Sequence, residues 1–184
     1  MAVVKVVLTY EDYAALPNDG KRYEILDGEL SVSPAPSPSH QFVALRLASA
    51  LDAYTTSERL GQVYIAPFDV ILFDTTIVQP DVLFFSTDRR SIISRRGAEG
   101  APTLVVEILS AWSVRNDRTT KFQLYARYGV PYYWIVDSDR RTIDVYRLRD
   151  QGYAEAETFS GDQLVDLPPF PGLRLDPALL WPST

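Results

Sequence analysis

Short apolar runs separated by polar turns dominate the chain and predict a β-sheet. Residues 79–86, 103–110 and 130–138 carry nearly continuous apolar segments, which is the pattern of strands buried on both faces. Residues 22–33 alternate around the dipeptide Asp27-Gly28, and this dipeptide between two β-rich runs is typical of a two-residue hairpin turn. We therefore expect several core strands and an N-terminal hairpin.

Helical periodicity appears in three segments. Residues 37–61 predict the longest helix, which Ser37 or Ser39 caps and Gly61 follows. Residues 115–129 predict an amphipathic helix, and residues 8–20 predict a short capped helix. The apolar face of the longest helix is predicted to consist of Phe42, Leu45, Leu47, Leu51 and Tyr54.

The remaining segments are irregular or form further strands. Residues 62–73 predict a strand interrupted at Pro67, and residues 141–153 a strand that pairs with the one before it. Residues 87–102 predict a polar loop with one short helix at most, and the proline-rich residues 167–184 a surface-wrapping segment. This order predicts an α/β (α+β) fold with one mixed sheet flanked by helices.

We expect one domain over residues 1–184, because no linker or internal repeat interrupts the pattern. Its core would cover about residues 38–150, with an N-terminal hairpin at 20–33 and a C-terminal wrapping segment at 151–184. The hydrophobic content of 46% is enough for a sizeable core.

The composition excludes several kinds of functional site. Cysteine is absent, which excludes disulfides and thiolate sites. His40 is the only histidine, which excludes a cluster of histidine ligands, and no Walker loop or dinucleotide fingerprint occurs. The first residues lack a signal-peptide pattern, and no apolar stretch is long enough to span a membrane, so we expect a cytoplasmic protein.

Charge is distributed unevenly along the chain. The net charge is −6, which disfavours nonspecific binding to nucleic acid. Residues 86–121 nevertheless hold seven basic and four acidic side chains, a net charge of +3 that leaves −9 for the remainder. This segment is either a set of scattered solvated charges or a phosphate-contacting surface. The candidate nucleic-acid contacts are Arg89, Arg90, Arg95, Arg96, Arg115 and Arg118.

Two carboxylates lie where the hydrophobic pattern does not call for them. Asp81 begins one predicted strand, close to solvent, and Glu107 lies inside another; a buried carboxylate needs a cationic partner or a metal. Lys121 and Asp117 follow on the next helix, one turn apart. Two carboxylates, a lysine and Mg²⁺ or Mn²⁺ would suit phosphodiester hydrolysis. The alternative is a site without metal, in which Asp81 is an ordinary turn residue and Glu107 faces solvent or pairs with an arginine.

Six motifs in order carry a resemblance to a known family: RYEILDGEL, SPSHQ, APFDVIL, QPDVLF, LVVEILS and DRTTKFQLYARYGVPYYWIVD. Over residues 8–150 the chain resembles the Uma family, catalogued among restriction endonucleases of the PD-(D/E)XK nuclease superfamily. The resemblance implies a restriction-endonuclease-like mixed sheet flanked by helices, a nuclease activity on DNA, and a divalent metal.

The motifs of the family match this chain residue by residue. Asp81 matches the aspartate of PD, and Glu107 matches the acidic residue of the second motif. The lysine of that motif would be residue 109, which is Leu109 here; in the family it looks to have migrated to the following helix, where Lys121 stands. Glu24 matches a recurrent glutamate of the N-terminal hairpin, and His40 matches a recurrent histidine at the helix start. Asp117, one helical turn before Lys121, would support the site with them.

One stretch departs from the family. After the strand that holds Glu107, the family usually continues LSPST, whereas this chain reads LSAWSV. Ala111 replaces the proline, and the bulky Trp112 follows it. Trp112 would pack against the following helix or stack on a nucleobase, and we expect packing.

The resulting hypothesis is a Mg²⁺-dependent or Mn²⁺-dependent endonuclease. Asp81 and Glu107 would bind the metal, and Lys121 would position the attacking water. Glu24 would contact the metal or pair with Arg22 or Lys21, and His40 would support the site rather than act as a base. The alternatives are an inactive nucleic-acid-binding protein and a structural Asp/Glu/Lys network. A homodimer is expected only by analogy with double-strand cutters.

Overall fold

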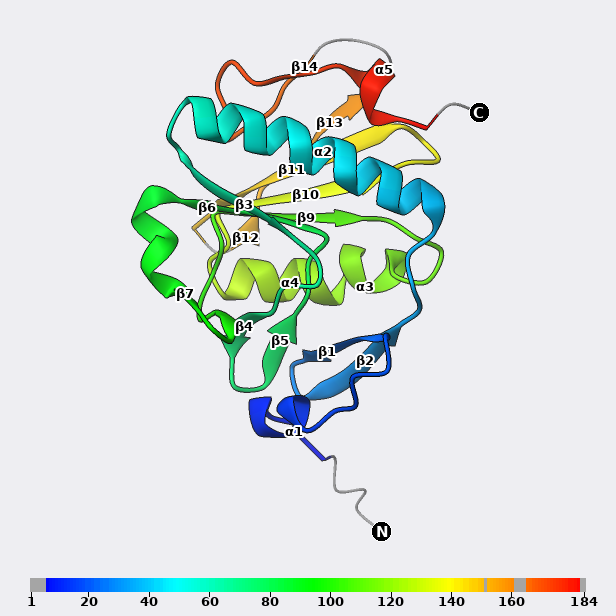
Figure 1. Ribbon diagram of the computed structural model, residues 1–184, viewed down its shortest axis with the longest axis vertical. Coiled ribbons are helices and arrows are strands. Elements are labelled where there is room, and N and C mark those ends of the chain that lie inside the picture. The colour runs from blue at the N-terminus through cyan, green and yellow to red at the C-terminus, as the bar shows by residue number, and fades with distance from the viewer. Residues whose placement is uncertain (1–5, 151, 161–164, 183–184) are drawn as a thin grey trace.

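The computed structural model describes residues 6–150, 152–160 and 165–182. These residues form helices around two larger sheets, as Figure 1 shows. The mixed α+β fold with flanking helices is confirmed, but the prediction of one sheet is wrong, because the described strands divide between two larger sheets and a two-stranded ribbon. No helix in the described part of the chain is long and apolar enough to cross a membrane.

The seven-stranded sheet carries the long apolar strands. Its order is β12-β11-β10-β9-β6-β3, with β13 also paired to β11. Within it, β9 and β10 run parallel, whereas β6 lies antiparallel to both β9 and β3. The bounds are β3 (Gly61–Ile65), β6 (Val82–Ser86), β9 (Leu104–Ile108), β10 (Tyr132–Asp137), β11 (Thr142–Arg149), β12 (Gly152–Tyr153) and β13 (Glu157–Ser160).

Both faces of this sheet are buried, which explains the continuous apolar runs. Val82, Phe84 and Val106 face the long helix α2 (Pro38–Ser57), while Leu83 and Val105 face α4 (Thr120–Arg127). Figure 1 shows α2 on one side of the strands and α4 on the other. Because Glu107 follows Val105 by two residues, its side chain is directed to the α4 face.

The second sheet has six strands in the order β2-β1-β5-β4-β8-β7. The predicted hairpin forms its edge, with Asp27 and Gly28 at positive φ in the turn. The segment 62–73 is split at Pro67, because β3 joins the first sheet and β4 the second. The bounds are β1 (Arg22–Leu26), β2 (Glu29–Ser33), β4 (Val70–Phe73), β5 (Thr76–Val78), β7 (Ile93–Ser94) and β8 (Gly97–Ala98).

The helices follow their predicted start signals. Ser37 caps α2 by accepting the backbone N–H of His40, and Thr9 forms a capping box with Asp12 at α1 (Tyr10–Ala14). The predicted apolar face of α2 is wrong at Leu45, because this residue is 62% exposed. The polar loop 87–102 contains the 3-10 helix η1 (Thr87–Ile92) before β7 and β8.

Two further segments differ from the prediction. The helix predicted over 115–129 is broken at Thr119 into α3 (Val114–Arg118) and α4. The C-terminal segment lies at the top of Figure 1, above α2, and supplies buried core side chains. These are Leu167, Phe170, Leu173, Leu175, Leu180 and Trp181. The segment contains β14 (Val165–Asp166), β15 (Arg174–Leu175) and α5 (Pro177–Leu180).

Candidate active site

Strand pairing brings the two unexpected carboxylates together. Val82 on β6 pairs with Val106 on the antiparallel β9. Extending this register by one residue sets Asp81 opposite Glu107 on the same face of the sheet. Both side chains are buried at 3% and 2% exposure, so Asp81 is less accessible than its position before the strand predicted. The two carboxylates line one cavity of about 240 Å³.

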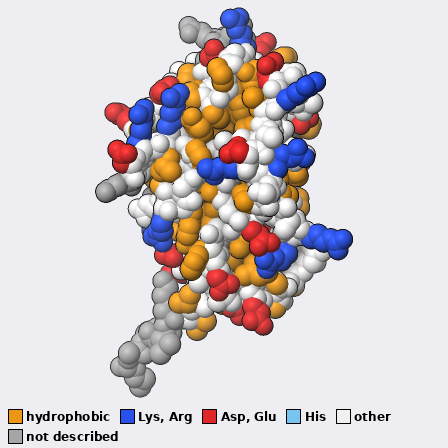
Figure 2. Space-filling view, turned by 90° about the vertical axis from the view of Figure 1, so that its left-hand side faces the viewer, with side chains coloured by type: hydrophobic (Ala, Val, Ile, Leu, Met, Phe, Trp, Pro, Cys, Tyr) orange, Lys and Arg blue, Asp and Glu red, His pale blue; other side chains and the backbone are white. Residues whose placement is uncertain are grey.

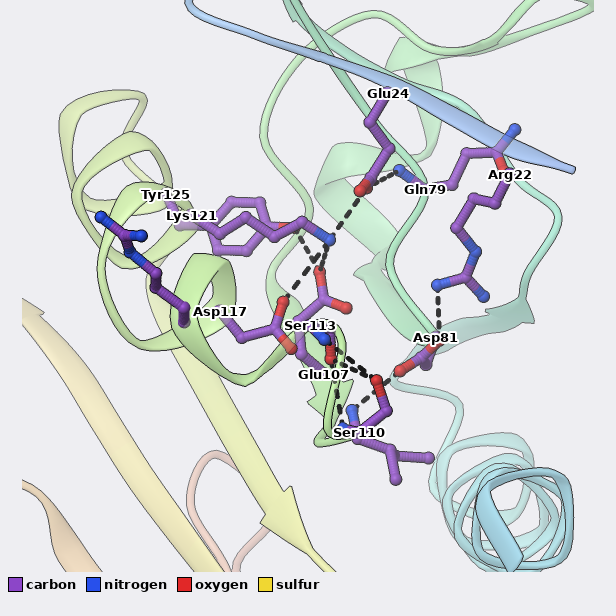
Figure 3. A network of polar contacts seen from close by, with 12 residues as sticks. Arg22, Glu24, Gln79, Asp81, Glu107, Ser110, Ser113, Asp117, Lys121 and Tyr125 are labelled. Carbon is purple, nitrogen blue, oxygen red and sulfur yellow. Dashed lines mark hydrogen bonds and ion pairs between the residues drawn. The ribbon is translucent and has the colours of Figure 1, made fainter. Parts of the chain in front are cut away.

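Lys121 lies at the centre of a cluster of carboxylates on the Glu107 side of this cavity. Its Nζ is 3.0 Å from Glu107 Oε1, 2.9 Å from Glu24 Oε1 and 3.7 Å from Asp117 Oδ1. Figure 3 shows the lysine amine pointing between these three side chains. Lys121 and Asp117 come from α4 and α3, whereas Glu24 comes from β1. Burial opposes the charge of Lys121, but Glu107 and Glu24 hold its pKa well above the usual value.

Glu107 is oriented by a second donor. The hydroxyl of Tyr125 donates to Glu107 Oε1 at 2.6 Å, so Lys121 and Tyr125 both bond the same oxygen. Tyr125 lies one helical turn after Lys121 on the same face of α4. In Figure 3 the other carboxylate oxygen of Glu107 is turned toward Asp81.

Asp81 is held by a separate set of partners. Arg22 Nη1 donates to Asp81 Oδ1 at 2.8 Å, and the backbone N–H of Ile108 donates to Oδ2 at 2.8 Å. His40 Nε2 lies 3.0 Å from the same Oδ2. Burial raises the pKa of Asp81, but the His40 hydrogen bond and the charge of Arg22 outweigh it, so the pKa is lowered. Asp81 therefore stays ionised.

The cavity contains more negative than positive charge. Its ionisable lining comprises four carboxylates, two cationic side chains and His40, which gives a formal charge of −2 when His40 is neutral. Burial raises the pKa of Glu107 well above its usual value, and burial also raises the pKa of Asp117. Neither oxygen of the buried Asp117 side chain accepts a hydrogen bond from the described residues.

This donor set fits a hard divalent cation. The described residues include no ready-made group of three His, Asp or Glu side chains arranged as a metal cage. Mg²⁺, however, is usually held by one or two carboxylates, with water and phosphate oxygens completing the shell. Asp81 and Glu107 supply two such carboxylates, and the surplus negative charge of the cavity favours a cation.

The predicted supporting residues line the same cavity, but their partners differ from those expected. Glu24 pairs with Lys121 instead of Arg22 or Lys21, and it also accepts the backbone N–H of Gln79 at 2.8 Å. Lys21 pairs with Asp19 at 2.7 Å. Sequence reasoning did not identify Arg22, Gln79 or Tyr125 as site residues. The spacing of Arg22 two residues before Glu24 on one strand was a usable signal, because such residues share a face.

Most of the predicted arginine contacts lie away from this cavity. Arg89 and Arg90 follow β6, at the end opposite Asp81, and Arg96 pairs with Glu99 at 2.7 Å. Figure 2 shows the face on the left of Figure 1, where basic and acidic side chains are interspersed. Arg95 is exposed in the same segment. Of the two α3 arginines, Arg118 pairs with Asp144 at 3.0 Å and Arg115 is exposed.

Comparisons with known proteins concern the fold and the family of this chain. One solved structure has a TM-score of 0.77 and 24% identity, and the match covers 95% of this chain and 97% of the other. It is described as "a putative nuclease belonging to DUF820 from Anabaena variabilis ATCC 29413". At this identity the likeness shows a shared fold. None of the curated proteins searched matches the chain.

A family model settles the classification. The model named Uma2, described as "Putative restriction endonuclease", matches residues 10–178. This range covers most of the 184 residues, so the resemblance seen in the six motifs is confirmed. The chain belongs to the Uma2 family.

Proposed function

We propose that this protein is a metal-dependent endonuclease that hydrolyses phosphodiester bonds in DNA. One observation carries the proposal. Asp81, which immediately precedes β6, lies opposite Glu107 on β9 when the strand register is extended by one residue, and the Lys121 amine is 3.0 Å from Glu107 in the same cavity. Buried carboxylates with perturbed pKa values in a cleft are typical of active sites.

Asp81 and Glu107 would hold Mg²⁺ or Mn²⁺. Such an ion, when bound, lowers the pKa of a coordinated water and stabilises negative charge on a phosphate. Arg22, His40 and the Ile108 N–H keep Asp81 ionised and fixed in orientation. The Tyr125 hydroxyl fixes the orientation of Glu107 by donating to Oε1.

Lys121 supplies a positive charge that its carboxylate neighbours hold in place. Its Nζ has three carboxylate neighbours within 3.7 Å, and an ammonium group has three donors. It can therefore keep one carboxylate contact while it orients a water or a phosphate oxygen. Preorganised charge of this kind is worth about 10²–10³-fold in rate. Glu24 and Asp117 hold the amine in position before the substrate binds.

A plasmid-nicking assay tests the proposal. Wild-type protein is incubated with supercoiled DNA in MgCl₂ or MnCl₂, with EDTA as a metal-free control. We expect nicked or linear product from the wild type, and at least about 10²-fold less from Asp81→Asn and Lys121→Met. Glu99→Gln is a matched control, because Glu99 is exposed and forms its ion pair with Arg96, away from the cavity. Unchanged cleavage by Asp81→Asn would contradict the proposed roles.

A structural role for the same residues is the second candidate. It is favoured by the burial of Lys121 at 3% exposure among three carboxylates, which makes a self-contained ion network. The two candidates differ in their response to metal. A catalytic site gains stability from Mg²⁺ or Mn²⁺, whereas a closed ion network does not.

Cleavage of both DNA strands would require two such sites. A homodimer is therefore part of the proposal for a double-strand cutter, and a monomer would deliver single-strand nicks. Sedimentation of the protein with and without DNA distinguishes these two forms.

A further inference from the structure

Trp112 is the exposed tryptophan of this protein. Its side chain is 63% exposed, whereas Trp134 and Trp181 are 0% and 7% exposed. The prediction that Trp112 packs against the following helix is therefore wrong. Tryptophan is highly buried on average, so an indole left in water next to a charged cavity calls for a functional explanation.

The turn that carries Trp112 is closed by its own hydrogen bonds. Ser110 N donates to Ser113 Oγ at 3.2 Å, and Ser113 N donates to Ser110 Oγ at 3.0 Å. The backbone N–H of Val114 also donates to Ser110 O at 3.1 Å. Trp112 thus lies on a short, internally bonded turn directly after β9, the strand that holds Glu107.

The indole ring is also fixed from the other side of the cavity. Trp112 Nε1 donates to the backbone oxygen of Val32 on β2 at 3.2 Å. Ser31 and Ser33 on β2 line the cavity together with Trp112, Glu107 and Lys121. With its N–H already bonded, the ring presents a preoriented aromatic surface at the rim of the cavity.

The cavity is small for a site that would enclose a whole nucleotide. Its volume is about 240 Å³, below the range of about 300–1,000 Å³ typical of sites for drug-sized ligands. A phosphate that approaches Asp81 and Glu107 would leave its attached base near the rim. Trp112 lies at that rim, and exposed aromatic rings bind unpaired bases by stacking.

We propose that Trp112 stacks on an unpaired nucleobase next to the phosphate bound in the cavity. This inference rests on the proposed nuclease function and deepens it, because it makes the preferred substrate a single-stranded or locally unpaired nucleic acid. DNA and RNA share the required chemistry.

Fluorescence titration tests the proposal. Single-stranded DNA, single-stranded RNA and duplex DNA of one sequence are titrated into the full chain in CaCl₂, since Ca²⁺ also takes oxygen ligands. Gel analysis verifies that each probe stays intact. We expect a single-stranded probe to quench the emission of the wild type and to bind more tightly than the duplex. In Trp112→Phe the two buried tryptophans should show no such quenching. Whichever single strand binds more tightly, the DNA or the RNA, is the preferred type of nucleic acid.

Three comparisons separate stacking from other roles. Trp112→Ala should bind the single strand between about 5- and 150-fold more weakly, the range for loss of one stacked base. Trp112→Phe keeps a ring but loses the bond to Val32, so it should stay within about three-fold of the wild type if stacking dominates. An oligonucleotide with abasic sites should bind the wild type and Trp112→Ala equally. Phe73→Ala is the matched control, because Phe73 is an exposed aromatic residue at the end of β4 and is not among the cavity residues.

Each adverse result overturns the inference. If Trp112→Ala and the wild type bind the single strand equally well, stacking on Trp112 is ruled out. If Trp112→Phe and Trp112→Ala lose the same binding affinity, the hydrogen bond to Val32 matters and stacking does not. Failure of the nuclease function is distinguishable from both. In that case the wild type leaves plasmid DNA intact in Mg²⁺ or Mn²⁺, whatever the result of the titration.

Discussion

The Nζ of Lys121 lies 3.0 Å from Oε1 of Glu107, although one side chain comes from a helix and the other from a strand. The contact is buried, and Glu24 and Asp117 also pair with the same ammonium group. One cation thus neutralises part of a site that contains three carboxylates on this side. This imbalance determines how the site should respond to mutation, pH and metal.

Removing the lysine should destabilise the protein strongly. Lys121→Met leaves Glu24, Glu107 and Asp117 without their shared cation, and breaking a buried ion pair from one side costs about 3–5 kcal/mol. Urea denaturation at neutral pH without metal measures this loss. Lys21→Met is the matched control, because Lys21 pairs with Asp19 on the exposed surface, and its free energy of unfolding should stay near the wild-type value. A loss as small as that of the control would show that the cluster is not an ion network.

Removing a carboxylate from the same cluster should have the opposite effect. Burial raises the pKa of Asp117, so the unfolded chain releases this proton more readily than the folded protein does. Above the unfolded pKa of about 3.9 the fold carries this penalty, which increases as pH rises toward the folded pKa. Asp117→Asn should therefore raise the metal-free stability at pH 7 by about 1 kcal/mol, or about 2–4 °C in Tm.

Calorimetry in EDTA checks the Asp117 prediction, with Asp139→Asn at an exposed position as the control. The same variant should lose activity, because sites tuned for function are often not at their stability optimum. A lower Tm for Asp117→Asn than for the wild type would contradict the charge imbalance.

Asp81 should give the opposite pH dependence. Its pKa is lowered in the fold because the His40 hydrogen bond and the Arg22 charge outweigh burial. A lowered carboxyl pKa contributes stability above the unfolded value of about 3.9, and this contribution is lost as pH falls toward the folded pKa. Asp81→Asn should therefore be less stable than the wild type at pH 7. This difference in the free energy of unfolding should shrink from about pH 5 downward. A difference that stays constant with pH would contradict the lowered pKa of Asp81.

The sequence predicted the unusual charges better than their partners. Asp81 stood out because it begins an apolar strand, and Glu107 because it lies inside one; the pairing of β6 with β9 brings them together. Lys121 was proposed as a possible cationic partner on the next helix, and the family resemblance then assigned it a catalytic position, because nothing in local periodicity links a helix residue to a strand. Arg22 and Tyr125 were missed because their contacts depend on how β1 and α4 pack around the cavity.

The second sheet and the exposed indole were also beyond local patterns. β5 has three residues and β7 and β8 have two each, too few for a period of two to be recognised. Trp112 was predicted to pack because large apolar side chains usually do. Its exposure follows from the turn at Ser110–Ser113 and the bond to Val32, which only the assembled structure reveals.

Metal binding should stabilise the wild-type protein. A ligand that binds only the folded state adds RT ln(1 + [L]/Kd), about 2.7 kcal/mol at 100 times Kd. This corresponds to a rise in Tm of about 5–10 °C for a chain of this size. Glu107→Gln should lose most of the rise, while the exposed control Glu99→Gln should retain it. A titration of Tm against MgCl₂ and MnCl₂ measures all three proteins, and an equal rise in Glu107→Gln would place the metal elsewhere.

The location of the metal can be observed directly by crystallography with Mn²⁺, whose anomalous scattering identifies the ion. Crystals of the wild type and of Asp81→Asn are grown or soaked in millimolar MnCl₂. If the proposed site is correct, the wild type shows one strong anomalous peak bonded to carboxylate oxygens of Asp81 and Glu107, and Asp81→Asn shows a weak peak or none. A wild-type cavity without a peak, or a peak that persists unchanged in Asp81→Asn, would contradict the metal site.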